Sequence, residues 1–543
     1  MTLLEPRRNA HEIERAGEKA LSRPVLLARL REAKTWDVVV IGGGATGLGC
    51  AVDAAARGFS VLLVEAQDFA KGTSSRATKL IHGGVRYLAQ CRLALVREAL
   101  VERARLLANA PHLVHPLRFV VPAYRWFDQP LLGAGLKIYD LLAGGAALGG
   151  SRLLNAARTV SALPTVNTAG LRGGIAYHDA QFDDARLALA LARTASDLGV
   201  LAINYCAASD FIVEDGRVRG LRVRDVETGD MHKVGARVLI NATGVWADRV
   251  RRLADPQATR LLRPSQGLHL VVGREFLPGT DALLVPRTDD GRVLFVIPWQ
   301  GRVVLGTTDT PCDDAPLEPE PLPGEADFIL ATAARYLVRA PTRADVRSAF
   351  VGLRPLIGAG DASATRTLSR EHVVEVSPQG LVSVTGGKWT TYRAMAEDAV
   401  DTALSVAKLG QPASPTSTLR LHGAPPSQAG SAGSAGSAGD VYGTDRESVE
   451  RLPGAGRRLV DGLSLTEAEV RFAAREEFAR GVEDVLARRH RALFLDAALA
   501  AQAAPAVAEL LAQELGFGAD WCAAECARFE ALAARYGDPG GSR

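Results

Sequence analysis

The chain has 543 residues, of which 47% are hydrophobic and 23% are charged, and its formal net charge is +3. This composition is typical of a globular protein with two to four domains, and the small net charge argues against nucleic acid as a partner. The six cysteines are scattered without a C-x-x-C pair, so neither a metal site nor a disulfide framework is predicted, and a reducing cytoplasm is the expected compartment.

The first 34 residues are mixed in charge and contain no apolar run of the kind that a secretory signal needs. A helix is expected over His11 to Arg31. Residues 1–34 are interpreted as an N-terminal extension without a functional site.

A nucleotide-binding unit is predicted directly after this extension. The apolar residues 38–41 indicate a buried strand, Gly42 to Gly47 carry the G-x-G-x-x-G spacing, a helix is expected to Arg57, and a second apolar strand ends at Glu65. This order is typical of the βαβ unit that binds a dinucleotide. A glycine-rich turn that holds no ligand is the alternative.

Each part of this motif has a physical role. Gly42 permits the tight turn, Gly44 lets the backbone approach a pyrophosphate, and Gly47 allows the helix to pack closely on the strand. The free N–H groups at the start of the helix attract the anion. Glu65 would accept hydrogen bonds from ribose hydroxyls and would repel a 2′-phosphate, which disfavours NADP.

A second site-like stretch covers residues 72–87, which are small and polar and include three basic residues, His82 and the pair Gly83-Gly84. Hydroxyls and glycines suit a backbone that lies against a cofactor. A helix is expected from Arg86 to Leu107. For Arg86 taken alone, a solvated position at the helix start is an equally good interpretation.

The most apolar long stretch, Leu131 to Leu154, is interrupted by charges and glycines, so it does not predict a membrane-spanning helix. Within it, basic and apolar residues mix over Lys137 to Leu142. This segment is predicted to be a buried helix, and a helix that lies on a membrane surface is the alternative.

The chain is expected to return to the first sheet twice. A helix is predicted from Asp183 to Leu198 and a buried strand over Val238 to Asn241, which ends at Ala242-Thr243-Gly244. Gly386-Gly387-Lys388 then opens another helix at a glycine turn. Between these segments, alternating strands over about residues 263–308 indicate an antiparallel sheet, the usual roof over the reactive ring of a flavin.

The fold class predicted from these patterns is α/β, with a Rossmann-like FAD-binding domain, an interleaved antiparallel-sheet substrate domain and an all-α C-terminal cap. The expected FAD-binding domain comprises 35–105, 183–260 and 369–410, and the substrate domain comprises 106–182 and 261–368. Residues 411–440 are rich in Ser, Ala, Gly and Pro and are predicted to be a flexible linker before the cap at 441–543. In the cap, Ser464 to Glu467 is predicted to be a capping box, and Arg488 to Arg491 a solvated face.

Together the motifs resemble the FAD-dependent glycerol-3-phosphate dehydrogenases, the aerobic, membrane-associated branch of the flavin amine and hydroxy-acid oxidoreductases. The resemblance extends from about Trp36 to Arg393 in the same order, and the cap resembles the family's helical C-terminal domain more loosely. The motifs that carry it are Ile41–Gly47, Gly72–Tyr87, Asn241–Trp246, Gly306–Asp309, Gly352–Leu356 and Gly386–Arg393.

The resemblance implies that sn-glycerol 3-phosphate is oxidised at C2 to dihydroxyacetone phosphate, with hydride passing to N5 of FAD. It implies His269 as the catalytic base and Arg354 as the cation that orients and polarises the oxygen at C2. For His269 the alternative is a satisfied core histidine. The residues expected to grip the substrate phosphate are Arg86, Tyr87, Arg370 and Lys388.

The expected cofactor-binding residues come from the same motifs. They are Gly42, Gly44, Ala45, Thr46, Gly47, Glu65, Thr73, Ser74, Ser75, Lys79, Leu80, His82, Gly83, Gly84, Gly244, Trp246, Asp309, Gly387, Lys388 and Thr390.

The expected electron acceptor is ubiquinone or another respiratory quinone, because the mid-chain insertion associated with oxygen-using glycerophosphate oxidases is not evident. The expected location is cytoplasmic, with peripheral attachment to the inner membrane, and a homodimer is left open. The rival interpretations are a glycerol-3-phosphate oxidase or other flavin amino-acid or hydroxy-acid oxidase that uses oxygen, a flavin-binding module without turnover, and a plain NAD dehydrogenase.

Overall fold

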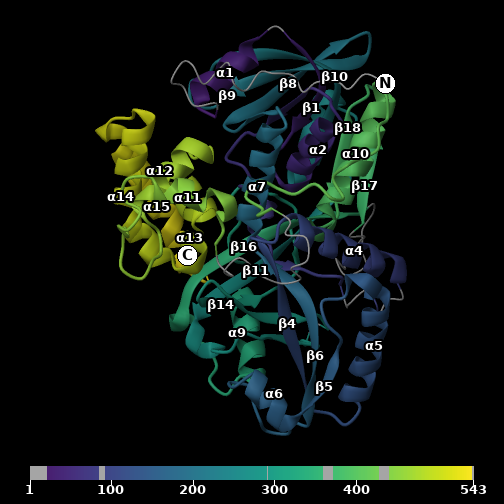
Figure 1. Cartoon of the computed structure of the whole chain (residues 1–543), viewed down its shortest axis with the longest axis vertical. Helices are drawn as coiled ribbons and strands as arrows, with labels where there is room; N and C mark the ends of the chain where they lie inside the picture. Colours follow the sequence, from purple (N-terminus) through teal and green to yellow (C-terminus); the bar gives the residue numbers. More distant parts are fainter. Residues whose placement is uncertain are drawn as a thin grey trace.

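Two β-sheets lie one beyond the other along the long axis of the molecule, and the C-terminal helices pack at their side (Figure 1). This computed structural model describes residues 21–32, 34–84, 88, 92–289, 291–358, 371–426 and 440–540. The α/β fold with an interleaved antiparallel sheet and a helical C-terminal part confirms the predicted fold class.

The first sheet contains the predicted nucleotide-binding unit. Its strands in the described chain are β1 (Thr35–Ile41), β2 (Val61–Val64), β7 (Leu201–Ile203), β8 (Cys206–Glu214), β9 (Arg217–Asp225), β10 (Met231–Asn241), β17 (His372–Val376) and β18 (Val382–Gly386). Strands β18, β10, β1, β2 and β7 are neighbours in this order and run parallel. Ile41 is paired with Asn241 on one side and Val64 on the other, so the carboxyl ends of the central strands are level.

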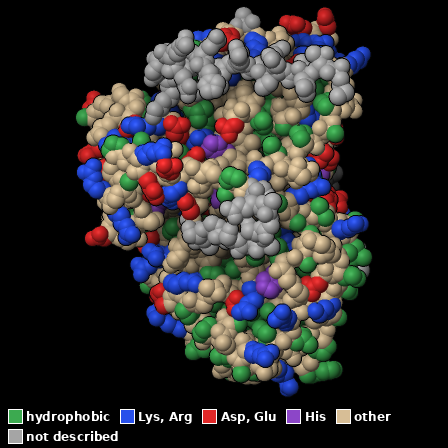
Figure 2. Space-filling view, viewed as in Figure 1, with side chains coloured by type: hydrophobic (Ala, Val, Ile, Leu, Met, Phe, Trp, Pro, Cys, Tyr) green, Lys and Arg blue, Asp and Glu red, His purple; other side chains and the backbone are tan. Residues whose placement is uncertain are grey.

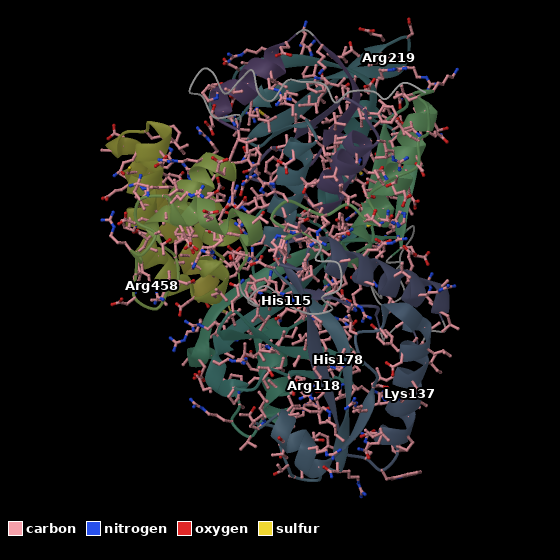
Figure 3. All side chains as sticks on the ribbon, in the orientation of Figure 1. His115, Arg118, Lys137, His178, Arg219 and Arg458 are labelled. Carbon is pink, nitrogen blue, oxygen red and sulfur yellow. The ribbon has the colours of Figure 1, made fainter. Side chains whose placement is uncertain are left out.

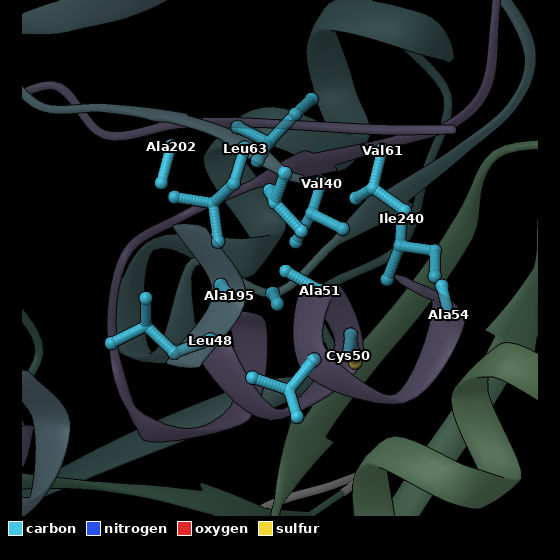
Figure 4. Packing of buried hydrophobic residues seen from close by; sticks show 14 of the residues in the cluster. Val40, Leu48, Cys50, Ala51, Ala54, Val61, Leu63, Ala195, Ala202 and Ile240 are labelled. Atoms are coloured by element: carbon cyan, nitrogen blue, oxygen red, sulfur yellow. The ribbon is translucent and has the colours of Figure 1, made fainter. Parts of the chain in front are cut away.

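Three helices cover the face of this sheet: α2 (Ala45–Ala56), α7 (Asp184–Asp197) and α10 (Tyr392–Val406). Figure 4 shows Leu48 and Ala51 of α2 packed beneath Val40 and Leu63 of the central strands. Helix α7 begins at the predicted place, because the side chain of Asp183 accepts a hydrogen bond from the N–H of Arg186. A further helix, α1 (Arg23–Arg31), packs near β7 and occupies the described part of the helix expected over residues 11–31.

The second sheet is the predicted antiparallel one, except that β4 and β12 pair in parallel. Its strands in the described chain are β3 (Leu80–Ile81), β4 (Val114–Ala123), β5 (Arg152–Asn155), β6 (Gly173–Phe182), β11 (Leu262–Gly273), β12 (Ala282–Val285), β13 (Leu294–Trp299), β14 (Arg302–Gly306), β15 (Thr310–Pro311) and β16 (Val346–Ile357). Strand β11 pairs with β16 over eleven residues of register and places Ser265 beside Arg354. Short helix α9 (Glu325–Tyr336) covers this sheet.

One helix at the far end of the second sheet differs from its prediction. Helix α5 (Asp128–Ala143) packs beside α4 (Leu93–Asn109), β5 and β6, and it buries Leu136 and Tyr139. Its outer face is exposed, with 67% of Leu131 and 80% of Leu141 accessible to solvent, so the prediction of a buried helix is wrong for that face. None of the helices in the described part of the chain is both long and apolar enough to cross a membrane.

The C-terminal part is helical, as predicted. Its helices are α11 (Arg446–Glu450), α12 (Glu467–Glu476), α13 (Ala492–Leu495), α14 (Ala497–Leu515) and α15 (Ala519–Gly537). The capping box lies two residues later than predicted, because the Thr466 hydroxyl accepts the N–H of Glu469 and the Glu469 carboxylate accepts the N–H of Thr466. This cap packs against the second sheet through the rings of Phe494 and Phe350, whose centroids are 4.9 Å apart.

The basic run at residues 488–491 is buried, so the prediction of a solvated face is wrong. Arg489 hydrogen-bonds the carboxylate of Asp68, and Arg488 pairs with Asp68 and Asp484. Arg491 donates to the carbonyl of Ser75 at 2.6 Å. These acids and carbonyls lie within the first sheet's loops and the cap, and they compensate for the burial of each guanidinium.

Residues 411–426 of the predicted linker pack against the rest of the protein, so the prediction of a flexible linker is wrong for them. Asn109 donates to the carbonyls of Thr416 and Ser417 at 3.3 Å each, and the Ser414 hydroxyl bonds the Asp53 carboxylate. Leu421 is buried. Residues 427–439, which hold the Ser-Ala-Gly repeats, are outside the described residues.

Candidate active site

A cavity of about 770 Å³ opens at the carboxyl ends of the parallel strands of the first sheet. It is bounded by the residues that follow β1, β2, β10 and β18, namely Gly42, Glu65, Ala242 and Gly387. In open α/β sheets, ligands bind at this edge. Of the expected cofactor-binding residues, the cavity is lined by Gly42, Gly44, Ala45, Thr46, Glu65, Thr73, Ser74, Gly244, Trp246, Gly387 and Lys388.

The middle of the cavity suits a pyrophosphate. Helix α2 begins here at Ala45, and its first turn carries no acidic side chain. The N–H of Ala45 donates to the Ser74 hydroxyl at 2.9 Å, so the segment around residue 74 lies across the helix N-terminus. The positive end of the helix dipole and the small residues of both segments favour an anion at this place.

The end of the cavity beside β2 suits a ribose. One oxygen of Glu65 accepts the N–H of Gly43 at 2.6 Å and the other accepts the N–H of Gln67 at 2.8 Å. Burial raises the pKa of Glu65, and these N–H groups oppose the rise only in part. A carboxylate oxygen that accepts one hydrogen bond can still accept a second one, which a ribose hydroxyl could donate.

Lys71 and Trp389 are among the cavity-lining residues that were not expected as cofactor contacts. Lys71 precedes the predicted polar stretch and pairs with the acids Glu318 and Glu483. Trp389 follows Lys388, and its indole N–H donates to the carbonyl of Ser74 at 2.9 Å. Both are sequence neighbours of expected site residues, which was the available signal. The cavity's volume, glycine turns and helix N-terminus fit a bound FAD.

His269 lies on β11, is not among the residues that line this cavity, and has a buried imidazole. The ring stacks on Phe350 with centroids 4.7 Å apart, and Nε2 lies 2.9 Å from the hydroxyl of Thr78. Burial lowers the pKa of His269 well below 6.5, and the cations of Arg354 and Lys79 lower it further. The ring is therefore neutral near pH 7 and able to accept a proton.

Arg354 lies on the adjacent strand β16, one residue before the cavity-lining Pro355. Its guanidinium donates to the carbonyls of Gln266 at 3.1 Å and Thr308 at 2.9 Å. The carboxylate of Asp309 lies 3.4 Å away. These contacts hold the cation at the junction of the second sheet and the cavity.

The other expected cofactor residues with described positions lie outside the cavity; they are Gly47, Ser75, Lys79, Leu80, His82, Gly83, Gly84, Asp309 and Thr390. Lys79 is buried, with its ammonium 2.7 and 2.9 Å from the carboxylate oxygens of Asp184. Leu80 belongs to β3 of the second sheet. Three of the expected phosphate-binding residues, Arg86, Tyr87 and Arg370, are outside the described residues.

Known proteins share both the sequence and the fold. The family model described as FAD dependent oxidoreductase matches residues 37–393, and the C-terminal domain of alpha-glycerophosphate oxidase matches residues 414–526. The chain is 40% identical to the mitochondrial glycerol-3-phosphate dehydrogenase of Homo sapiens over 91% of this chain and 73% of that protein. It is 41% identical to the mitochondrial enzyme of Arabidopsis thaliana over 88% of this chain and 82% of that protein.

Among solved structures, the glycerol-3-phosphate dehydrogenase from Bacillus halodurans complexed with FAD has 29% sequence identity and a TM-score of 0.77. The alignment covers 97% of this chain and 99% of that chain. A glycerophosphate oxidase from Mycoplasma pneumoniae, with 17% identity and a TM-score of 0.54, shares the fold.

Proposed function

Because the chain belongs to the family of FAD-dependent glycerol-3-phosphate dehydrogenases, we propose that it passes the electrons of its reaction to a respiratory quinone at a membrane surface. The protein is an FAD-dependent glycerol-3-phosphate dehydrogenase. The quinone as electron acceptor and the attachment to a membrane are what we propose beyond this activity. The observation that supports them most is the exposed apolar face of helix α5.

The proposed roles within the site follow from charge and position. Bound FAD supplies the hydride acceptor for oxidation of the alcohol at C2. His269, neutral and buried, takes the hydroxyl proton, and Arg354 orients the same oxygen and stabilises negative charge on it. Lys388, at the cavity wall, holds the phosphate. The expected partners of Lys388 in this grip, Arg86, Tyr87 and Arg370, stay a proposal from the sequence.

The outer face of α5 forms an apolar stripe. Leu131, Ala134, Ile138 and Leu141 follow the spacing of one helix face, and all four are exposed. The exposed Leu153 of β5 extends the stripe, since its side chain lies beside Gly133 of α5. Monomeric soluble proteins rarely leave neighbouring large apolar side chains exposed in this way.

Basic side chains border the stripe, which favours an anionic lipid surface as its partner. Lys137 lies on α5 and is labelled in Figure 3 at the end of the molecule away from the first sheet. Arg152 and Arg158 are exposed on and after β5. Figure 2 shows hydrophobic and basic side chains intermingled at this end. A membrane contact here would bring a lipid-soluble quinone to the protein, in agreement with the proposed peripheral attachment to the cytoplasmic face of the inner membrane.

The double substitution Leu131→Asp/Leu141→Asp is expected to weaken binding to vesicles of phosphatidylcholine and phosphatidylglycerol by about 100-fold or more. Each leucine that is no longer buried in the lipid lowers the binding free energy by about 1.5–3 kcal/mol. Co-sedimentation with vesicles measures the change. Val213→Asp, which also places a charge at an exposed apolar position but on β8, is the control and should bind as the wild type does.

Two outcomes would contradict this surface. Unchanged sedimentation of the double variant would exclude α5 as the membrane contact. A wild-type dimer in solution that the double variant converts to a monomer, with no vesicle binding by either, would assign the stripe to contact between two copies of the chain.

The electron acceptor is tested on the purified holoprotein. Glycerol 3-phosphate added without oxygen is expected to bleach the flavin absorbance, and a short-chain ubiquinone analogue is expected to restore it much faster than oxygen does. The measurement is stopped-flow absorbance, with an assay for hydrogen peroxide alongside. Fast reoxidation by oxygen with stoichiometric peroxide would instead identify an oxidase.

A further inference from the structure

The imidazole of His269 is enclosed on several sides by described residues. Phe350 covers one ring face with an interplanar angle of 10°, and the whole side chain is only 2% exposed. A Cβ atom on Gly306 would lie 2.4 Å from Cδ2 of the ring, so the absence of a side chain there leaves the space that the ring occupies. A proton that reaches this ring has to pass one of its few neighbours.

Thr78 is the side chain that hydrogen-bonds this ring in the described part of the chain. Its hydroxyl lies 2.9 Å from Nε2, whereas Nδ1 is buried beside the backbone of Gly267. Unlike His269, Thr78 is partly exposed. The hydrogen bond therefore joins the buried ring to a residue that solvent reaches in part.

The two residues beside Thr78 in the chain are held in place by polar contacts. The ammonium of the next residue, Lys79, contacts the Asp184 carboxylate and donates to the carbonyl of Ser75 at 2.8 Å. The preceding N–H, that of Ala77, donates to the same carboxylate at 2.9 Å. Asp184 thus fixes both neighbours of Thr78 and with them the direction of its side chain.

We propose that the hydroxyl of Thr78 relays the proton between the substrate and His269. The inference rests on the proposed role of His269 as the base. In the step, the O–H bond of the substrate breaks and its proton binds Oγ1 of Thr78, while the hydroxyl proton of Thr78 moves to Nε2 of His269. One O–H bond is lost and one is gained at Thr78, and the ring becomes cationic. The electron pair of the broken substrate O–H bond forms the C2=O bond, and the electron pair of the C2–H bond leaves with the hydride, for which bound FAD would be the acceptor.

This arrangement also gives Lys79 a role other than a cofactor contact. Its ammonium lies 5.0 Å from the ring centroid of Phe350, on which His269 stacks. The Lys79–Asp184 pair therefore positions the relay, and the positive charge of Lys79 adds to the effects of burial and of Arg354 that lower the pKa of the imidazole. It touches neither the cavity nor the ring directly.

Thr78→Val removes the hydroxyl at nearly constant volume and is expected to slow anaerobic flavin reduction by about 100-fold or more, the usual contribution of a positioned proton-transfer group. Thr78→Ser keeps a hydroxyl and is expected to restore most of the rate. Thr402→Val, which removes a hydroxyl on α10 away from the cavity, is the matched control. Flavin content and melting temperature establish that each variant is folded and loaded.

The variant His269→Ala and the double variant His269→Ala/Thr78→Val separate the relay from the base. When two residues act in the same proton-transfer path, the rate losses from removing each do not add. The double variant should therefore be as slow as His269→Ala alone. A slow His269→Ala with a fast Thr78→Val would overturn the relay and leave the base in place. A fast His269→Ala would overturn the base and the relay together. A Thr78→Val defect that serine does not restore would show that Thr78 acts only through packing.

Discussion

Gly47→Ala is expected to raise the dissociation constant for FAD by about 5- to 150-fold. A Cβ atom at this position would lie 1.9 Å from the carbonyl oxygen of Gly42, which is backbone and cannot turn away as a flexible side chain could. Helix α2 must then move off the turn that follows β1. Overpacking of this kind costs about 1–3 kcal/mol, and about 1.4 kcal/mol corresponds to a tenfold change in affinity.

The measurement is titration of the flavin-free protein with FAD, followed by flavin absorbance after gel filtration. Gly410→Ala is the matched control, because a Cβ atom there meets nothing within 4 Å. Affinity equal to the wild type in Gly47→Ala would show that the helix does not need this close approach. A loss of folding in both the free and the loaded variant would place the effect in the core rather than at the cofactor.

The nucleotide-binding unit could be predicted because its signals are local. Apolar residues 38–41 and 61–64, the glycine spacing and Glu65 all lie within one short segment, and each has a physical reason to be there. The same holds for the start of helix α7, which was predicted at Asp183. These elements are where the structure and the sequence patterns agree most closely.

The basic run at residues 488–491 shows what local patterns miss. Four basic residues in a row usually indicate a solvated face. Here the partner that makes burial of Arg489 favourable is Asp68, which lies 421 positions earlier in the chain. A charge pattern carries no information about so distant a counter-charge.

Some residues of the candidate site could also be predicted from local motifs, whereas contacts between distant positions could not. The glycine turns and Glu65 were predicted as cavity residues from their motifs. By contrast, the link between Thr78 and His269 joins positions 191 apart, and the burial of Lys79 depends on Asp184. The exposure of the outer face of α5 could not be predicted for another reason. An apolar helix face has the same sequence pattern whether other elements cover it or solvent reaches it.

Arg489→Ala is expected to lower the free energy of unfolding by about 3–5 kcal/mol, the usual effect of removing one partner from a buried ion pair. Asp68 is fully buried and hydrogen-bonds Arg489, Arg488 and Asn204. Burial alone would raise the pKa of Asp68, but the two guanidinium groups outweigh it and hold this pKa below its ordinary value. Without Arg489 the carboxylate stays buried with less compensation.

The destabilisation by Arg489→Ala should also weaken the binding of FAD. Asp68 lies between the cavity-lining residues Gln67 and Ala70, and Lys71 of the cavity wall is paired with Glu483 of the cap. The buried cluster therefore ties the cap to one wall of the FAD cavity. Arg489→Ala is expected to release FAD at lower denaturant concentration than the wild type does.

Chemical denaturation of the holoprotein, followed by circular dichroism and flavin fluorescence, measures both effects. Arg451→Ala is the matched control, because Arg451 belongs to the same cap but pairs with Glu447 at the surface, where an ion pair contributes about 0–1 kcal/mol. The double variant Asp68→Asn/Arg489→Met removes both charges and should recover part of the loss, since no carboxylate is then left buried without its partner. Equal destabilisation by Arg489→Ala and Arg451→Ala would mean that the pair of Arg489 with Asp68 contributes no more than a surface contact.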